Sequence, residues 1–273
     1  MYLGWILLII LLLAVAYTFK PYVLPKIIWT HWDTMDMPEL CRLNLERTRR
    51  MLPDWDVRFF TTADFAKWDA PIPEGFEKLQ IQHKTDFMRL WLLKNYGGVW
   101  MDISVVLNTS LNGLWQECVS QQAEMSGFWI EKLTTSPHYL VFENWFIMAP
   151  QNSRLIAVWY EEFVKAIRMG FQAYQKATLR EGVDPQKIID DGGGGTYLTQ
   201  HLCYQAVIQK RLWLPPHIIL KRAEDTMFMV HSECGFMAEC MKKRFATIDF
   251  DDIPWIKLRG GDRALFPIER LKE

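Results

Sequence analysis

The 273-residue sequence lacks a surplus of basic charge. Its 31 Lys and Arg residues stand against 32 Asp and Glu residues, so the formal net charge is -1. A protein that neutralises the backbone of a nucleic acid needs a basic surface, and we therefore expect no nucleic-acid partner. Charged residues make up only 23% and hydrophobic residues 50% of the chain. This balance excludes intrinsic disorder and predicts a sizeable core.

Cysteine is scarce, odd in number and scattered. The chain has 5 cysteines and no Cys-x-x-Cys pair, so we expect neither a disulfide scaffold nor a structural zinc site. Cys234 and Cys240 could pair in an oxidising compartment, but free core cysteines are the preferred interpretation. The cysteines do not indicate whether the protein's compartment is oxidising or reducing.

Aromatic residues, by contrast, are abundant. They make up 14% of the chain and include 13 Trp. Such a content fits a protein that stacks rings against planar or sugar ligands, and it fits a Trp-rich core equally well. The composition does not separate these two interpretations.

No Lys or Arg precedes the apolar run at residues 2–19. The missing basic segment argues against a cleaved signal peptide, although Ala14-Val15-Ala16 looks like a cleavage site. A run of this length reaches the lower limit for spanning a hydrocarbon layer of about 30 Å. We therefore predict a single-pass transmembrane anchor at 2–19 and a short stem at 20–25. The Lys and Arg residues that follow favour a body on the cytoplasmic side of the membrane, and a Golgi-lumenal body is the alternative.

Residues 26–273 contain no long linker, repeat or low-complexity segment, so we predict one domain there. The patterns predict strands at 26–30, 55–60, 99–101 and 105–107, an apolar run at 142–148, and helices at 39–51, 84–96 and 153–169. Strands that alternate with helices indicate an α/β fold with a mixed, mostly parallel sheet flanked by helices.

The residues with the clearest chemistry lie between 84 and 104. Asp86 and Arg89 are three apart on a predicted helix and share one face. Gly97-Gly98 ends this helix and allows a close backbone approach. Asp102 follows a buried strand, at the end where ligands bind in open α/β sheets, and a hard cation held by carboxylates and substrate phosphates fits there. Alternatively, Thr85 or Asp86 caps the helix and the Asp–Arg pair is a weak surface pair.

This segment resembles the core motif of the family-32 glycosyltransferases and the related capsular polysaccharide synthesis proteins. Their motif is a helix with Asp and Arg, then Tyr-Gly-Gly, then an apolar strand that ends in a DXD-type motif. The stretches 25–32 and 143–149 are similar to flanking segments of that family. The resemblance implies a GT-A, Rossmann-like fold. It also implies a membrane-anchored enzyme that transfers a hexose from a nucleotide-diphosphate sugar to a glycan or glycolipid acceptor, with retention of configuration.

The resemblance also implies roles for individual residues. Donor sugar and catalysis would involve Asp86, Arg89, Asp102 and Glu143. The nucleotide-diphosphate side would be formed by Ile28, Trp29, Thr30, Gly97, Gly98 and Lys257. A Mn²⁺ or Mg²⁺ ion that helps the diphosphate to leave would be held by Asp102, Ser104 and His231. Ser104 stands where a second Asp is usual, which makes a poorer metal site.

Other features of the sequence leave alternatives open. Gly192–Gly195 could wrap a phosphate or form a plain loop. Asp249, Asp251 and Asp252 could bind a cation or simply face water. His231 follows the apolar run 227–230, which we interpret as a strand. At the level of function, the rivals are phosphoryl transfer by an aspartyl nucleophile and a non-catalytic sugar-nucleotide-binding or scaffold protein of a polysaccharide-synthesis assembly.

Overall fold

The computed structural model describes Trp5, residues 21–191 and residues 195–272. Apart from Trp5, the predicted membrane anchor lies outside these residues, and so do Gly192, Gly193 and Gly194. Within the described part of the chain, no helix is both long and apolar enough to cross a membrane. The anchor therefore stays a prediction.

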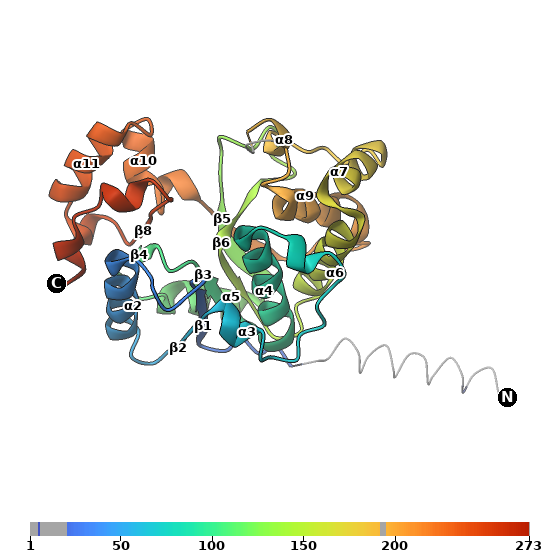
Figure 1. Ribbon diagram of the computed structural model, residues 1–273, viewed down its shortest axis with the longest axis horizontal. Coiled ribbons are helices and arrows are strands. Elements are labelled where there is room, and N and C mark those ends of the chain that lie inside the picture. The colour runs from blue at the N-terminus through green and yellow to red at the C-terminus, as the bar shows by residue number, and fades with distance from the viewer. Residues whose placement is uncertain (1–4, 6–20, 192–194, 273) are drawn as a thin grey trace.

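A six-stranded sheet forms the centre of the molecule (Figure 1). Its order is β2 (Asp56–Phe60), β1 (Ile27–His31), β3 (Gly98–Met101), β6 (Phe142–Ala149), β5 (Met125–Trp129) and β7 (Ile218–Arg222). β1 is parallel to β2 and β3, and β7 is parallel to β5, whereas β6 is antiparallel to both of its neighbours. The predicted mixed, mostly parallel sheet of an α/β fold is thus confirmed.

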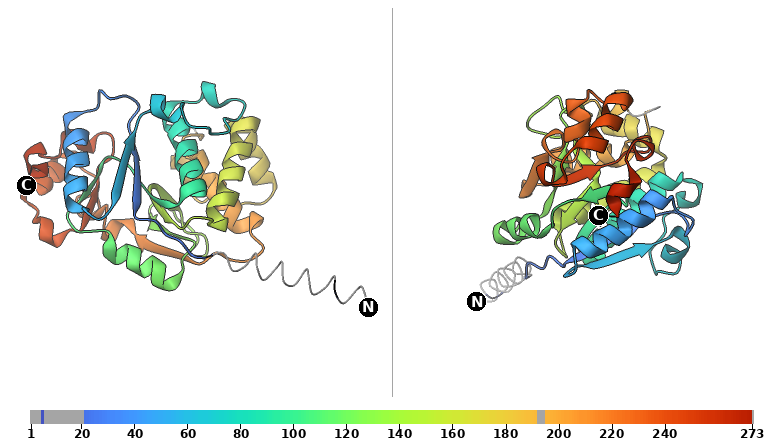
Figure 2. Two further views of the ribbon diagram at one scale, coloured as in Figure 1. Left: turned by 90° about the horizontal axis from the view of Figure 1, so that it is seen from below. Right: turned by 90° about the vertical axis from the view of Figure 1, so that its left-hand side faces the viewer.

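Helices cover one face of this sheet on the side away from the C-terminus (Figures 1 and 2). α4 (Ile81–Tyr96) and α9 (Thr199–Ala206) both pack against α6 (Arg154–Met169), and α4 also contacts β3. Ser153 caps α6, because its hydroxyl accepts a hydrogen bond from the Ile156 amide at 3.2 Å. Further helices are α3 (Thr62–Phe65), α5 (Asn112–Gln121), α7 (Phe171–Arg180) and α8 (Ile188–Asp191).

A second, smaller core lies on the C-terminal side. It joins α2 (Glu39–Met51), α10 (Met229–Glu233) and α11 (Ala238–Thr247) to a two-stranded antiparallel sheet of β4 (Val105–Leu107) and β8 (Trp255–Lys257). Figure 1 shows these helices across the sheet from α6 and α7. The single-turn helices are η1 (Phe76–Lys78), η2 (Val207–Arg211), η3 (Ala223–Asp225), η4 (Phe250–Asp252), η5 (Asp262–Ala264) and η6 (Ile268–Leu271).

Local details correct three expectations. The apolar run 227–230 forms a turn that leads into α10 instead of a strand, since a short apolar run has no period that separates the two structures. α4 begins at Ile81, so neither Thr85 nor Asp86 caps it. Cys234 and Cys240 form a disulfide, while the other three cysteines are free and buried.

The predicted stem is part of the folded body. Leu24 is buried in the main core, and Val23 forms a β-bridge with Gln151. The Tyr22 hydroxyl lies within hydrogen-bond distance of the carbonyl oxygens of Cys118 and Ala123, at 3.1 and 3.0 Å. These contacts tie the residues before β1 to the sheet.

Candidate active site

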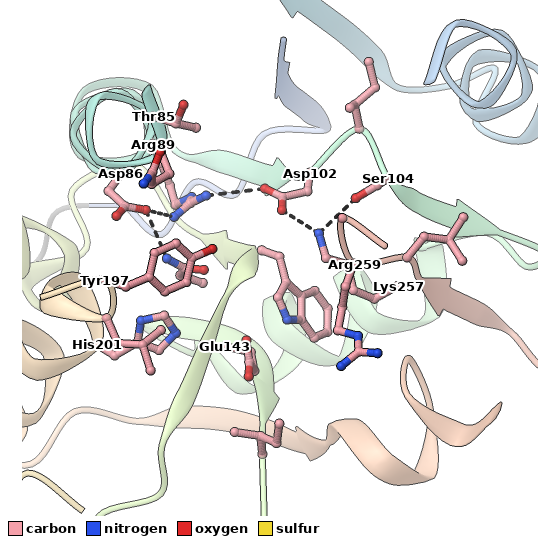
Figure 3. Close-up of a pocket in the computed structure, with 18 of the residues that line it drawn as sticks. Thr85, Asp86, Arg89, Asp102, Ser104, Glu143, Tyr197, His201, Lys257 and Arg259 are labelled. Carbon is pink, nitrogen blue, oxygen red and sulfur yellow. Dashed lines mark hydrogen bonds and ion pairs between the residues drawn. The ribbon is translucent and has the colours of Figure 1, made fainter. Parts of the chain in front are cut away.

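A cleft of ≈ 980 Å³ lies between the two cores. Residues from α4, β6 and α9 line one side of it, and residues 257–260 together with Arg263 line the other. Figure 3 shows the polar side chains that converge there. The volume is in the range typical of small-molecule sites.

The ends of two parallel strands bring side chains to this cleft. β1 ends at His31 and β3 ends at Met101, directly before Asp102, and both His31 and Asp102 line the cleft. The carboxyl ends of neighbouring parallel strands meet at one edge of a sheet, which is where ligands bind in open α/β folds. The predicted position of Asp102 is therefore the one that the structure shows.

Asp86 and Arg89 form a buried network, not the weak surface pair of the alternative interpretation. Their residues are only 5% and 4% exposed, and Arg89 Nη1 lies 2.5 Å from Asp86 Oδ1. Arg89 Nη1 also donates to Gln200 Oε1 at 2.7 Å. The Asn144 amide donates to the same Asp86 and Gln200 oxygens at 3.0 and 2.6 Å. Buried charges need such compensation, and it fixes both side chains beside the cleft.

Asp102 is the point where several groups meet. Its Oδ1 accepts from Trp100 Nε1 at 3.0 Å and faces Arg89 Nη2 at 3.4 Å, while its Oδ2 pairs with Lys257 Nζ at 2.6 Å. Its side chain keeps 28% exposure toward the cleft. Burial alone would raise the pKa of this carboxyl, but the positive charges of Lys257 and Arg89 outweigh burial and hold the pKa below 3.8. Asp102 is therefore an anion at neutral pH.

Lys257 reaches Asp102 from the C-terminal core. Its ammonium also donates to Ser104 Oγ at 3.0 Å, so one cation bridges both polar side chains of the acidic motif (Figure 3). β8 holds it there, since Lys257 is paired with Val105 of β4. The role of Lys257 near the diphosphate stays a prediction, and the structure places its ammonium beside Asp102.

Glu143 projects from β6 between the group with Tyr197 and His201 and the group with Lys257 (Figure 3). Burial raises the pKa of its carboxyl from 4.5 to about 7. Lys257 opposes this rise, and the carboxylates of Glu224 and Asp102 add to it. A carboxyl that titrates near neutral pH in a cleft is suited to acid–base chemistry.

Histidines in the cleft were not singled out by the sequence. His201 is buried, and neither ring nitrogen has a hydrogen-bond partner among the described residues. Burial lowers the pKa of His201 to about 4, with Asp86 opposing the effect and Arg89 adding to it. Its neutral imidazole can thus bind a ligand hydroxyl. His31 Nδ1 lies 3.3 Å from the Thr85 hydroxyl, and burial likewise lowers its pKa to about 4.

The residues predicted to border the nucleotide lie behind the cleft. Ile28, Trp29 and Thr30 are all buried in β1, and Trp29 Nε1 donates to the Gly97 carbonyl at 2.9 Å. The cleft begins only after them, with His31 and Trp32. The side chains that reach the cleft therefore lie at the end of β1, after the three residues that the sequence analysis assigned to the nucleotide.

Gly97 and Gly98 lie at the opposite end of β3 from Asp102. Their φ angles are 65° and 94°, in the region that favours glycine. A Cβ on Gly97 would come within 2.5 Å of the Gln151 amide nitrogen, and one on Gly98 within 2.7 Å of the Ile27 carbonyl oxygen. The close approach predicted for this pair is therefore to neighbouring backbone, and neither glycine lines the cleft.

His231 and the acidic turn do not join the site. His231 is fully buried in α10, and its Nε2 pairs with Asp262 Oδ2 at 2.9 Å, outside the lining of the cleft. Asp249 accepts from the Asp251 amide and caps η4. Over the described ranges, no three His, Cys, Asp or Glu side chains are placed to hold a metal ion.

Local sequence patterns pointed to only some of the residues that line this cleft. Asn144 stands within 143–149, which is similar to a flanking segment of the family. Gln200 and His201 come from α9, more than a hundred residues after Asp86, and no local pattern marks them. Tyr197 follows the glycine run and lines the cleft.

Curated relatives match about half of the chain. "Glycosyltransferase afumC" of Aspergillus fumigatus is 36% identical over 155 residues, which are 50% of this chain and 39% of the relative. "O-glycosyltransferase braB" of Annulohypoxylon truncatum is 29% identical over 167 residues, 54% of this chain and 39% of the relative. The chain thus matches less than half the length of these relatives.

Solved structures of similar shape include glycosyltransferases. The PaToxG glycosyltransferase gives a TM-score of 0.46 at 12% identity, over 92% of this chain and 88% of that chain. The galactosyltransferase LgtC, solved with donor and acceptor sugar analogs, gives 0.44 at 15% identity, over 90% of this chain and 94% of that chain. The model of the family described as "capsular polysaccharide synthesis protein" matches residues 17–168, more than half of the sequence. The chain belongs to the capsular polysaccharide synthesis protein family.

Proposed function

We propose that the protein is a glycosyltransferase of the GT-A type. It transfers a hexose from a nucleotide-diphosphate sugar to a glycan or lipid-linked acceptor, with retention of configuration. The observation that carries the proposal is the cleft in which Asp102 meets the Asp86–Arg89 network and Lys257. The relatives that match about half of the chain are named as glycosyltransferases, which supports the proposal.

The proposed reaction assigns a task to each side of the cleft. The bond between the anomeric carbon and the diphosphate oxygen breaks, and its electron pair leaves with the diphosphate. The acceptor oxygen forms the new bond on the face that the diphosphate leaves, which retains the configuration, and its proton passes to Glu143, whose pKa of about 7 suits a general base. Asp86 and Arg89, which are already fixed by Gln200 and Asn144, position the sugar hydroxyls together with His201.

The Mn²⁺ or Mg²⁺ ion predicted from the sequence does not suit the side chains found here. Both oxygens of Asp102 already face cationic or N–H donors, and Ser104 Oγ accepts from Lys257. His231 pairs with Asp262 in the C-terminal core. This donor set offers a metal one compensated carboxylate and a hydroxyl, so we derive no step of the reaction through a metal ion.

The predicted anchor at 2–19 bears on where in the cell the reaction takes place. We propose a single-pass membrane protein whose body faces the cytoplasm, because Lys and Arg residues follow the apolar run. The Cys234–Cys240 disulfide favours the alternative, a body in an oxidising lumen. Protection of the body from protease in sealed vesicles of known orientation tests this topology, and the opposite protection pattern would indicate the lumenal arrangement.

The function is tested by donor binding and hydrolysis over a panel of nucleotide sugars, in EDTA and in Mn²⁺, for the wild type and Asp102→Ala. We expect one donor to be turned over by the wild type and not by the variant. Asp54→Ala is the matched control, since Asp54 also pairs with a lysine, Lys26, but on the outside of the body. Its activity should equal that of the wild type.

Each outcome assigns the protein to a class. Turnover of one donor that is lost only in Asp102→Ala establishes the transferase and names its sugar. Binding without turnover, even after acceptors are screened, favours the non-catalytic sugar-nucleotide-binding protein. If no donor binds under either condition, the assignment of the cleft is wrong.

A further inference from the structure

The ammonium group of Lys257 occupies the centre of the acidic motif. It lies 2.6 Å from Asp102 Oδ2 and 3.0 Å from Ser104 Oγ. These two side chains are the ones that would have to bind a divalent cation, so a metal ion at Asp102 would lie directly against a positive charge. Arg89 faces the other carboxylate oxygen of Asp102, and the position between Asp102 Oδ2 and Ser104 is filled by a lysine.

The fold holds this lysine firmly. Its side chain is only 8% exposed, and its backbone amide donates to the Met227 carbonyl at 2.9 Å. The next amide, of Leu258, donates to the Ser104 carbonyl at 3.0 Å. The backbone at the end of β8 is thus bonded to the acidic motif itself, which holds the Lys257 backbone beside Asp102.

The charges of the motif match a monovalent cation. A motif with two carboxylates is neutralised by a divalent metal ion. Asp102 with Ser104 carries one negative charge and is neutralised by one ammonium, because the Arg89 guanidinium is already paired with Asp86. Serine at the position of the second carboxylate and lysine at the position of the metal therefore form one consistent arrangement. An ammonium has three N–H donors, and Asp102 and Ser104 take two, which leaves one for an anionic ligand.

We propose that Lys257 takes the place of the divalent cation and binds the donor's diphosphate without a metal ion. This inference rests on the proposed function and deepens it. When the bond to the anomeric carbon breaks, its electron pair moves to the diphosphate oxygen, and the ammonium stabilises the charge that develops there. Lysine is a common phosphate ligand that acts as a point charge, and Lys257 is preorganised for that task by Asp102 and Ser104.

The test measures binding of uridine diphosphate and guanosine diphosphate by calorimetry, in EDTA and in excess Mn²⁺. We expect the wild type to bind one of them equally well under both conditions. Lys257→Met should weaken this binding by about 10- to 100-fold, the loss of one charge-assisted hydrogen bond. Lys94→Met is the matched control, because Lys94 also pairs with a carboxylate at 2.6 Å, that of Glu161, but on the outer surface of α4.

A charge-exchange variant tests the same inference in the opposite direction. Ser104→Asp combined with Lys257→Ala restores two carboxylates and empties the cation position. This double variant should bind the nucleoside diphosphate only when Mn²⁺ is present. Electron paramagnetic resonance of Mn²⁺ added to protein alone should show saturable binding to the double variant and none to the wild type.

The wild type alone is enough to overturn the inference. If EDTA abolishes its binding of both nucleoside diphosphates and Mn²⁺ restores it, a metal ion binds the diphosphate and Lys257 does not replace it, while the proposed function stands. If neither nucleoside diphosphate binds in EDTA or in Mn²⁺, the proposed function fails, and the inference fails with it.

Discussion

The raised pKa of Glu143 predicts a specific pH dependence of stability. The folded state holds the Glu143 proton with a pKa of about 7, and an unfolded chain holds it with the ordinary value of 4.5. For a carboxyl whose pKa rises on folding, the protonated form favours the folded state, so stability falls as the pH rises from the unfolded value through the folded value. The difference between these values corresponds to about 3 kcal/mol when the carboxyl is fully ionised.

The substitution Glu143→Gln removes this penalty and keeps the shape of the side chain. We expect the variant to gain about 2 kcal/mol over the wild type between about pH 5 and about pH 8 in urea denaturation, because most of the titration falls in that window. Glu74→Gln is the control, since Glu74 is exposed and its carboxylate meets nearly the same solvent in the folded and unfolded states. A constant difference between Glu143→Gln and the wild type over this range would refute the raised pKa.

The same titration bears on the proposed reaction. A general base must be ionised, so the transfer rate of the wild type should rise with pH through about 7. Glu143→Gln should lower the rate by about 10²- to 10⁴-fold, the usual contribution of a general base, while binding of the nucleoside diphosphate stays within a few fold. If the variant is more stable than the wild type at high pH but inactive, its loss of activity is catalytic and does not come from unfolding. Full activity of the variant would mean that Glu143 is not the base.

Three further predictions concern separate parts of the molecule. Gly98→Ala should destabilise the fold by more than about 1 kcal/mol in denaturation experiments, because its φ of 94° and the nearby carbonyl oxygen leave no room for a Cβ; an unchanged midpoint would contradict this. Asp86→Asn should lower turnover by about 10²-fold with little change in nucleoside diphosphate affinity, since Asp86 orients Arg89 toward the sugar; equal losses in both would place it at the diphosphate. Reduction of the Cys234–Cys240 disulfide should cost about 2 kcal/mol of stability by the loop-entropy model, and Cys234→Ser should show no further effect of reductant.

The part of the site that follows from local sequence is the part between α4 and β3. The helix, the glycine pair and the acidic residue are consecutive, so their period and their breaks determine where each residue lies. This places Asp86 and Arg89 on one helix face and Asp102 at a strand end, as the structure shows. The same reasoning cannot tell which neighbour the glycines approach, because Ile27 and Gln151 are distant in sequence.

Contacts between distant segments were beyond such reasoning. Lys257 is separated from Asp102 by 155 positions, and its role depends on the pairing of β4 with β8, which no local pattern specifies. The disulfide, by contrast, joins residues only six apart across the turn between α10 and α11, and the sequence left this pairing open. The strand prediction before His231 was wrong because four apolar residues fit a strand or a helix equally well. His231 is part of α10, and its side chain lies in the C-terminal core.

Trp100 resolves the question that the high tryptophan content raised. It is almost fully buried in the main core, yet its ring lies 4.9 Å from the Arg89 guanidinium and its Nε1 donates to Asp102. One buried indole thus packs the sheet and fixes the two charged groups whose positions matter most in the cleft. A phenylalanine at this position would preserve much of the packing but leave Asp102 without its neutral donor. A tryptophan can therefore pack in the core and also position charged groups of the site, because the strand that carries it ends at the site.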